Sequence, residues 1–129
     1  MLSSNYKQDN LILNLTFDFS LVIIDFSEKL NEMHKFVLSN QILRSGTSIG
    51  ANVKEAQDAE SKSDFIHKFK IAAKEADEAE YWLLLAQHSK YYPETTTLLN
   101  QLTEIQKIIN KIISTTKRNY LKSLFSFLF

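Results

Sequence analysis

The stretch QILRSGTSIGANVKEA, from Gln41 to Ala56, carries the pattern that decides how this chain is expected to fold. Its apolar and small residues alternate between spacings of four and three, at Ile42, Gly46, Ile49, Val53 and Ala56. This heptad spacing is typical of a helix that packs nearly parallel to its neighbours. The stretch therefore predicts a helix over about residues 35–58, placed inside a bundle of helices.

Gly46 and Gly50 lie four residues apart and are the only glycines in the sequence. Each glycine inside a helix lowers helix stability by roughly 1 kcal/mol relative to alanine, so the presence of glycine at both positions needs an explanation. Small residues at this spacing let a second helix come close, and we expect the alanines of the following helix to make that contact. The alternative is that one of the two glycines marks a break in the helix.

A line of polar residues runs along the same helix at intervals of four, beginning at Arg44. It either faces solvent or lies between helices, where carboxylates of the next helix would meet it. If those two helices are antiparallel and turn near residue 60, Arg44 comes level with residue 76. A guanidinium is the cation best suited to share such carboxylates in a buried or half-buried contact. The candidate structural polar network is Arg44, Ser48, Asn52, Glu75 and Glu78.

Three further helices are expected, over about residues 16–34, from Ser61 to residue 90, and over residues 94–116. The first has a stripe at Phe19, Val22, Ile23, Phe26, Leu30 and Met33, with Phe17, Leu21 and Ile24 outside it. The last two have seams at Phe65, Phe69, Ala72, Ala76, Ala79, Leu83 and Ala86, and at Leu98, Leu102, Ile105, Ile109, Ile112 and Thr116. Apolar residues on more than one face of the first helix predict a partner surface.

The scarcity of turn residues favours long helices joined by few loops, because the chain has only two glycines and one proline. We therefore predict an all-α fold, an antiparallel up-down-up-down four-helix bundle over residues 16–118. Residues 1–15 are expected to form a loosely ordered arm. Residues 119–129 form a basic and apolar tail that departs from the seam of the fourth helix. That helix is expected either to bend near residues 117–119 or to end there.

Composition excludes several functional classes. Fifteen basic and fifteen acidic residues give a formal net charge of zero, which argues against a dedicated nucleic-acid binder. No cysteine is present, and the closest approach to a di-metal bundle motif is a single Asp64–His67 spacing. Nucleophile elbows and phosphate-binding loops are absent as well. We expect no enzyme, no cofactor and no metal, and, since neither a signal peptide nor a membrane span is recognisable, a cytoplasmic protein.

The fourth helix nevertheless carries a basic face, with no acidic residue after Glu104. At 100° per residue its members project to one side, roughly opposite the apolar seam. Three interpretations stay open: a solvated face, a contact with RNA or DNA that also uses the aromatic tail, and attachment to a membrane surface. The candidate nucleic-acid or partner face is Lys107, Lys111, Arg118 and Lys122.

Two motifs carry a resemblance to a known family: RSGTSIGAN at residues 44–52 and KEADEAEYWL at residues 74–83. Over about residues 17–116 the chain resembles bacterial four-helix bundle proteins, which include those encoded in intervening sequences of large ribosomal RNA genes. Accessory proteins of diversity-generating retroelements are a related group. The resemblance implies an antiparallel bundle, commonly a homopentamer with a central channel, and no catalytic residues.

Retroelement members of that group bind nucleic acid and reverse transcriptase through a markedly basic surface, whereas this chain is neutral. The expectation is therefore a non-enzymatic, self-associating bundle with a scaffold or binding role, whose main partner is a further copy of itself or another protein. The alternative is an accessory protein that associates with nucleic acid or reverse transcriptase through the basic face of the fourth helix.

Overall fold

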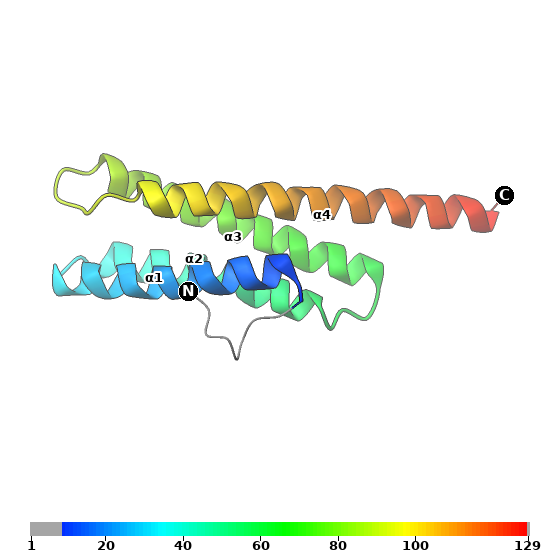
Figure 1. Cartoon of the computed structure of the whole chain (residues 1–129), viewed down its shortest axis with the longest axis horizontal. Helices are drawn as coiled ribbons and strands as arrows, with labels where there is room; N and C mark the ends of the chain where they lie inside the picture. Colours follow the sequence, from blue (N-terminus) through cyan, green and yellow to red (C-terminus); the bar gives the residue numbers. More distant parts are fainter. Residues whose placement is uncertain (1–8, 129) are drawn as a thin grey trace.

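The computed structural model describes residues 9–128, and within that range the regular structure is entirely helical. Four helices follow one another: α1 (Leu11–Glu32), α2 (Phe36–Ala56), α3 (Lys62–His88) and α4 (Thr96–Leu128). They lie side by side along one long axis, and α4 extends beyond the other three at its C-terminal end (Figure 1). The predicted all-α four-helix bundle is confirmed.

Side-chain contacts between consecutive helices show that each helix runs antiparallel to the one before it. Asn10, at the start of α1, donates to Gln57, just past the end of α2. The same reversed order holds for Arg44–Glu75 and Glu55–Lys68 between α2 and α3, and for Asp77–Gln106 and Gln87–Thr96 between α3 and α4. Within the described residues α1 packs on α2 and α4, and α3 packs on α2 and α4, so the diagonal pairs do not meet.

The core is built from the heptad seams. Every seam residue of α2, from Ile42 to Ala56, is buried, as is the seam of α3 from Phe69 to Ala86. In α4 burial stops after Ile109, and Ile112 lies at the edge of the core. The helical period therefore identified the inward positions correctly, and the seam fades where α4 begins to leave the bundle.

Gly46 and Gly50 face α1, which corrects the prediction that they pack against the alanines of α3. A Cβ placed on Gly46 would lie 2.9 Å from both Cγ1 and Cγ2 of Ile23. A Cβ on Gly50 would lie 3.3 Å from Thr16. Neither glycine breaks the helix, because α2 is continuous across both. The close approach inferred from their spacing is present, but it is made by the preceding helix.

A buried pair of serines links α1 to α2 by hydrogen bonds near the turn between them. The hydroxyl oxygens of Ser27 and Ser39 lie 2.6 Å apart, and Ser39 Oγ also donates to the Ser27 carbonyl at 3.0 Å. Both residues are buried. Each hydroxyl thus has a partner in the other helix, which offsets the cost of removing it from water. Nothing in the sequence pattern distinguished these serines from exposed ones.

The turn between α1 and α2 is made without a glycine. His34 adopts a left-handed conformation, with φ of 59°, directly after the end of α1. The Lys35 N–H bonds to the Leu30 carbonyl at 2.8 Å and the His34 N–H to the Asn31 carbonyl at 3.0 Å. This pair of bonds is the Schellman ending of a helix, in which glycine is the usual residue. Both glycines of the chain are used instead for helix contact.

The helix boundaries differ from the predicted ones mainly at the two ends of the chain. α1 begins at Leu11, five residues before the predicted Thr16, because Asn10 accepts the Leu13 N–H and caps the helix there. The predicted arm lies, over residues 1–8, outside the described residues. α3 begins where predicted, with Ser61 accepting the Asp64 N–H at 3.0 Å. α4 neither ends nor breaks near residue 117 but continues to Leu128.

The two glycines should respond differently to alanine. Gly46→Ala is expected to lower the free energy of unfolding by about 1–2 kcal/mol, because overpacking against the stiff, β-branched Ile23 outweighs the gain in helix propensity. Gly50→Ala is expected to change it by no more than about 0.5 kcal/mol, because its tight contact and its propensity gain nearly offset each other. Urea denaturation of both variants measures the difference. Equal effects would show that the Gly46–Ile23 contact does not limit the approach of α1 to α2.

Candidate functional site

Arg44 is the centre of the polar cluster on the outer surface of α2 and α3. Its Nη1 lies 3.2 Å from Oε2 of Glu75, and its Nη2 contacts Oε2 of Glu78. Gln41, one turn earlier, accepts from the guanidinium at 3.4 Å. One turn of α3 thus presents two carboxylates to a single guanidinium.

The cluster is half-buried at the surface of the bundle, the less buried of the two kinds of contact between helices that the sequence left open. The Arg44 side chain is 48% exposed, and those of Glu75 and Glu78 are 23% and 40% exposed. Water therefore screens the pair, and an exposed ion pair contributes only about 0.2–1 kcal/mol. Arg44 lies at the outer edge of the contact between α2 and α3, whereas Gly46 lies in the contact between α2 and α1.

Ser48 and Asn52 do not reach α3. Ser48 Oγ donates to the Arg44 carbonyl at 2.6 Å, and Asn52 Nδ2 donates to the Ser48 carbonyl at 2.8 Å. Both side chains thus bond one turn back on their own helix, a common habit of short polar residues in helices. The structure therefore joins Arg44, Glu75 and Glu78, and leaves Ser48 and Asn52 outside that cluster.

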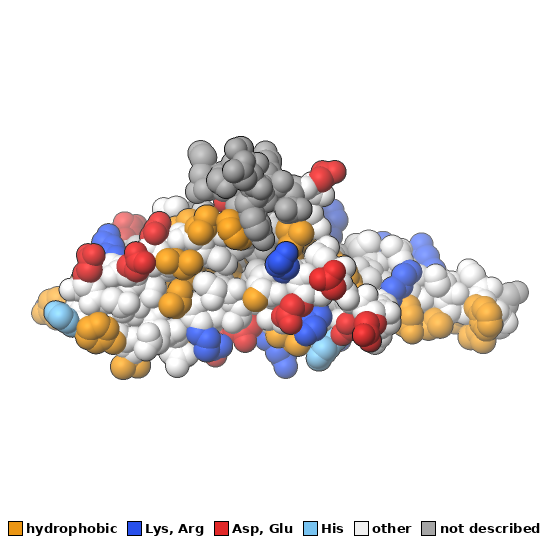
Figure 2. Space-filling view, turned by 90° about the horizontal axis from the view of Figure 1, so that it is seen from below, with side chains coloured by type: hydrophobic (Ala, Val, Ile, Leu, Met, Phe, Trp, Pro, Cys, Tyr) orange, Lys and Arg blue, Asp and Glu red, His pale blue; other side chains and the backbone are white. Residues whose placement is uncertain are grey.

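The basic face of α4 is exposed along its whole length. Lys107 lies 3.6 Å from Glu104 of its own helix. Among the described residues no carboxylate lies within ion-pair distance of Lys111, Arg118 or Lys122. Figure 2 shows hydrophobic side chains gathered with lysine and arginine at the projecting end of α4. The exposed apolar members there include Leu121, Leu124, Leu128 and Phe127.

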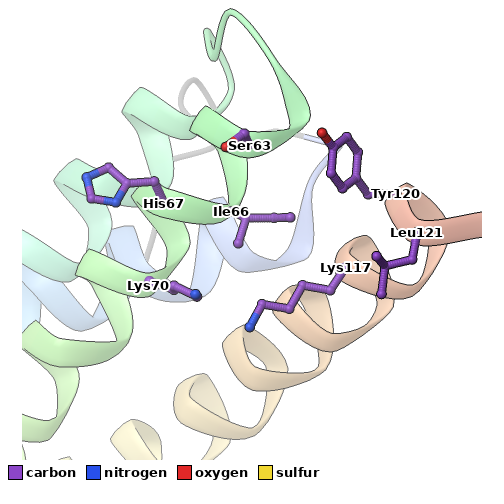
Figure 3. A pocket seen from close by; sticks show the side chains of 7 residues that line it. All are labelled: Ser63, Ile66, His67, Lys70, Lys117, Tyr120 and Leu121. Carbon is purple, nitrogen blue, oxygen red and sulfur yellow. The ribbon is translucent and has the colours of Figure 1, made fainter. Parts of the chain in front are cut away.

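A second basic group, which the sequence did not reveal, lies in a cleft between α3 and α4. Lys70 of α3 and Lys117 of α4 line this cleft and extend toward each other (Figure 3). Lys117 lowers the pKa of Lys70 below its ordinary value, because it can donate a hydrogen bond to the uncharged Lys70 amine and repels the charged form. The helical spacing of each lysine could be read from the sequence, but their meeting depends on the α3–α4 register.

Neither a cluster of metal ligands nor a membrane-spanning helix is found among the described residues. Between residues 9 and 128 no three histidine, cysteine, aspartate or glutamate side chains gather closely enough to hold a metal ion. Asp64 and His67, the nearest match to a metal motif in the sequence, have no third such side chain beside them in that range. None of the helices in this range combines the length and hydrophobicity that crossing a membrane requires.

The fold defines a four-helix bundle protein. Its surface is distinguished by clusters of charged residues and by exposed apolar side chains. The chain belongs to the 23S rRNA-intervening sequence protein family, whose family model matches residues 8–111. The match ends within α4, so the projecting part of that helix lies beyond it.

A solved structure supports the same assignment. It is the crystal structure of a protein with unknown function from the S23 ribosomal protein family of Bacteroides thetaiotaomicron VPI-5482. The two sequences are 45% identical over 79% of this chain and 97% of that chain, with a TM-score of 0.76. No curated protein matches this chain. The relation to retroelement accessory proteins stays a prediction.

A double-mutant cycle tests whether the Arg44 cluster acts as a unit. Arg44→Ala is expected to cost about 1 kcal/mol, more than Lys54→Ala on the same helix, which has no ion-pair partner among the described residues. Changing Arg44 together with Glu75 or Glu78 should cost less than the sum of the single changes. The coupling should shrink in high salt, because the groups are partly exposed. Additive costs in both cycles would show that the contacts contribute nothing to stability.

Proposed function

We propose that this protein is a non-enzymatic, self-associating helical bundle that acts in the cytoplasm as a scaffold or binding protein. The supporting observation is an apolar cluster on the outer face of α3, within the part of the chain that the family model matches. Leu84 and Leu85 lie one helical turn after Tyr81, and Tyr81 is 57% exposed. An apolar cluster of this kind marks a surface that a partner covers.

The neighbouring Trp82 lies beside this cluster. Its ring lies edge-on to Tyr81, with centroids 5.3 Å apart. Its indole Nε1 is buried, yet no acceptor among the described residues bonds it. A buried donor without a partner is unusual and needs an explanation. An acceptor from another copy of the chain would reach this nitrogen only if assembly moved the side chains that cover it in the single chain.

Self-association is the first consequence. At micromolar concentration the protein should scatter light as an oligomer, with a mass near five times the 14.9 kDa of one chain if it forms the pentamer common in the family. Burying the α3 cluster supplies the driving force, since apolar surface removed from water contributes roughly 25 cal/mol per Å². A mass near that of a single chain would exclude the proposal.

The same measurement on two variants locates the contact. Tyr81→Ser with Leu85→Ser should shift the protein toward smaller species. Leu121→Ser with Leu124→Ser removes comparable exposed apolar surface from the projecting end of α4 and should leave the mass unchanged. The reverse pattern would move the contact from α3 to α4.

Nucleic-acid association through the basic face of α4 is the second candidate function. The observation in its favour is that Lys111, Arg118 and Lys122 point away from the bundle without carboxylate partners in the described residues. Exposed apolar and aromatic side chains continue from them along the helix, and lysines with aromatics are the groups that hold single strands.

Salt dependence separates this candidate from a purely structural role. Wild-type protein should bind RNA or DNA with an affinity that falls steeply as salt is raised, because each neutralised phosphate releases a counterion. Lys107, Lys111 and Lys122 changed together to glutamate should abolish binding. Absence of wild-type binding at about 50 mM salt, where phosphate contacts are strong, would leave the scaffold role alone.

A further inference from the structure

The cleft between the first half of α3 and the distal part of α4 combines cavity, charge and hydrogen-bond donors in one place. Its volume is about 420 Å³, enough to admit a small anion together with water. Ile66 and Leu121 contribute apolar walls, and Lys70, Lys117 and Tyr120 contribute polar groups. The cleft exists only because α4 remains helical past the point where its core seam ends.

The two lysines face each other without any neutralising carboxylate. Figure 3 shows their side chains extending toward one another across the cleft. Among the described residues no aspartate or glutamate lies within ion-pair distance of either ammonium group. The nearest acids along α3, Asp64 and Glu75, do not line the cleft: Asp64 accepts the Glu60 N–H, and Glu75 contacts Arg44.

The sequence around each lysine also omits the usual helical partners. Ion pairs within a helix form at spacings of three and four. Around Lys70 those positions hold Ile66, His67, Ala73 and Lys74. Around Lys117 they hold Ile113, Ser114, Tyr120 and Leu121. Neither lysine therefore has a carboxylate within its own helix, in a chain that pairs Lys107 with Glu104 and Lys68 with Glu55 elsewhere.

Hydroxyl groups complete the lining on the side of the α3 N-terminus. The Tyr120 hydroxyl points from α4 toward the first turn of α3, where Ser63 lies (Figure 3). Both hydroxyls can donate hydrogen bonds. The cleft thus offers two lysines, two hydroxyl donors and the His67 imidazole to an entering ligand, and no acidic side chain lines it.

We propose that the Lys70–Lys117 cleft binds a phosphate group, held between the two ammonium groups. A phosphate placed there replaces the repulsion between two like charges with two charge-assisted hydrogen bonds. The phosphate belongs either to a small free anion or to the backbone of a nucleic acid, and the chemistry of recognition is the same for both.

Isothermal titration calorimetry on the full chain tests the proposal with two probes, inorganic pyrophosphate and a mixed-sequence single-stranded oligonucleotide. At about 0.1 M salt, where distant charges are largely screened, at least one probe should bind the wild type. Lys117→Gln and Lys70→Gln should each weaken that binding roughly tenfold or more, because each removes a charged hydrogen-bond donor.

The control is Lys54→Gln, which makes the same change of charge at an exposed position of α2 outside the cleft and should alter affinity by less than about twofold. Both cleft lysines are exposed to solvent, and thermal melts of each variant verify that the bundle is intact. Binding of pyrophosphate with this lysine dependence identifies a free anion as ligand. Binding of the oligonucleotide alone with the same dependence identifies backbone phosphate. Equal weakening by Lys54→Gln, or no binding of either probe, would overturn the proposal.

Discussion

The close approach of α2 to α1 at Gly46 is the contact on which the rest of the bundle depends. Ile23 fills the space that a Cβ would occupy, so at this point only the Ile23 side chain lies between the two helix backbones. The buried Ser27–Ser39 pair fixes the same two helices near their turn. With α1 seated on one side, α2 presents Arg44 on the side where α3 packs. α2 therefore joins the two halves of the molecule.

The heptad pattern predicted which residues point inward, because burial follows the period of the helix. It did not predict which neighbour each small residue meets. Gly46 and the alanines of α3 are both small, and pairing them was reasonable from spacing alone. The structure instead places a branched side chain of α1 against Gly46. Inward direction is a property of one helix, whereas the choice of partner depends on the rotation of two.

The same distinction explains the polar sites. Arg44 could be placed beside Glu75 and Glu78 because a short turn fixes the antiparallel register, but its exposure depends on how widely α2 and α3 are splayed at their surface. The Lys70–Lys117 cleft could not be predicted from the sequence, for a different reason. It needs α4 to continue past the end of its apolar seam, where the change of pattern predicted a bend or an end. Each lysine alone has the features of an ordinary solvated side chain.

The continuation of α4 to Leu128 has a consequence for how its last turns form. A helix is costly to nucleate, and isolated segments shorter than about 12–15 residues are marginal in water. The exposed turns after Leu121 avoid that cost, because they propagate from turns already fixed in the bundle. These turns are therefore helical because the packed part of α4 is already helical, and they should fray first on warming. The apolar side chains of these turns therefore share one helical surface only as long as the packed part of α4 stays folded.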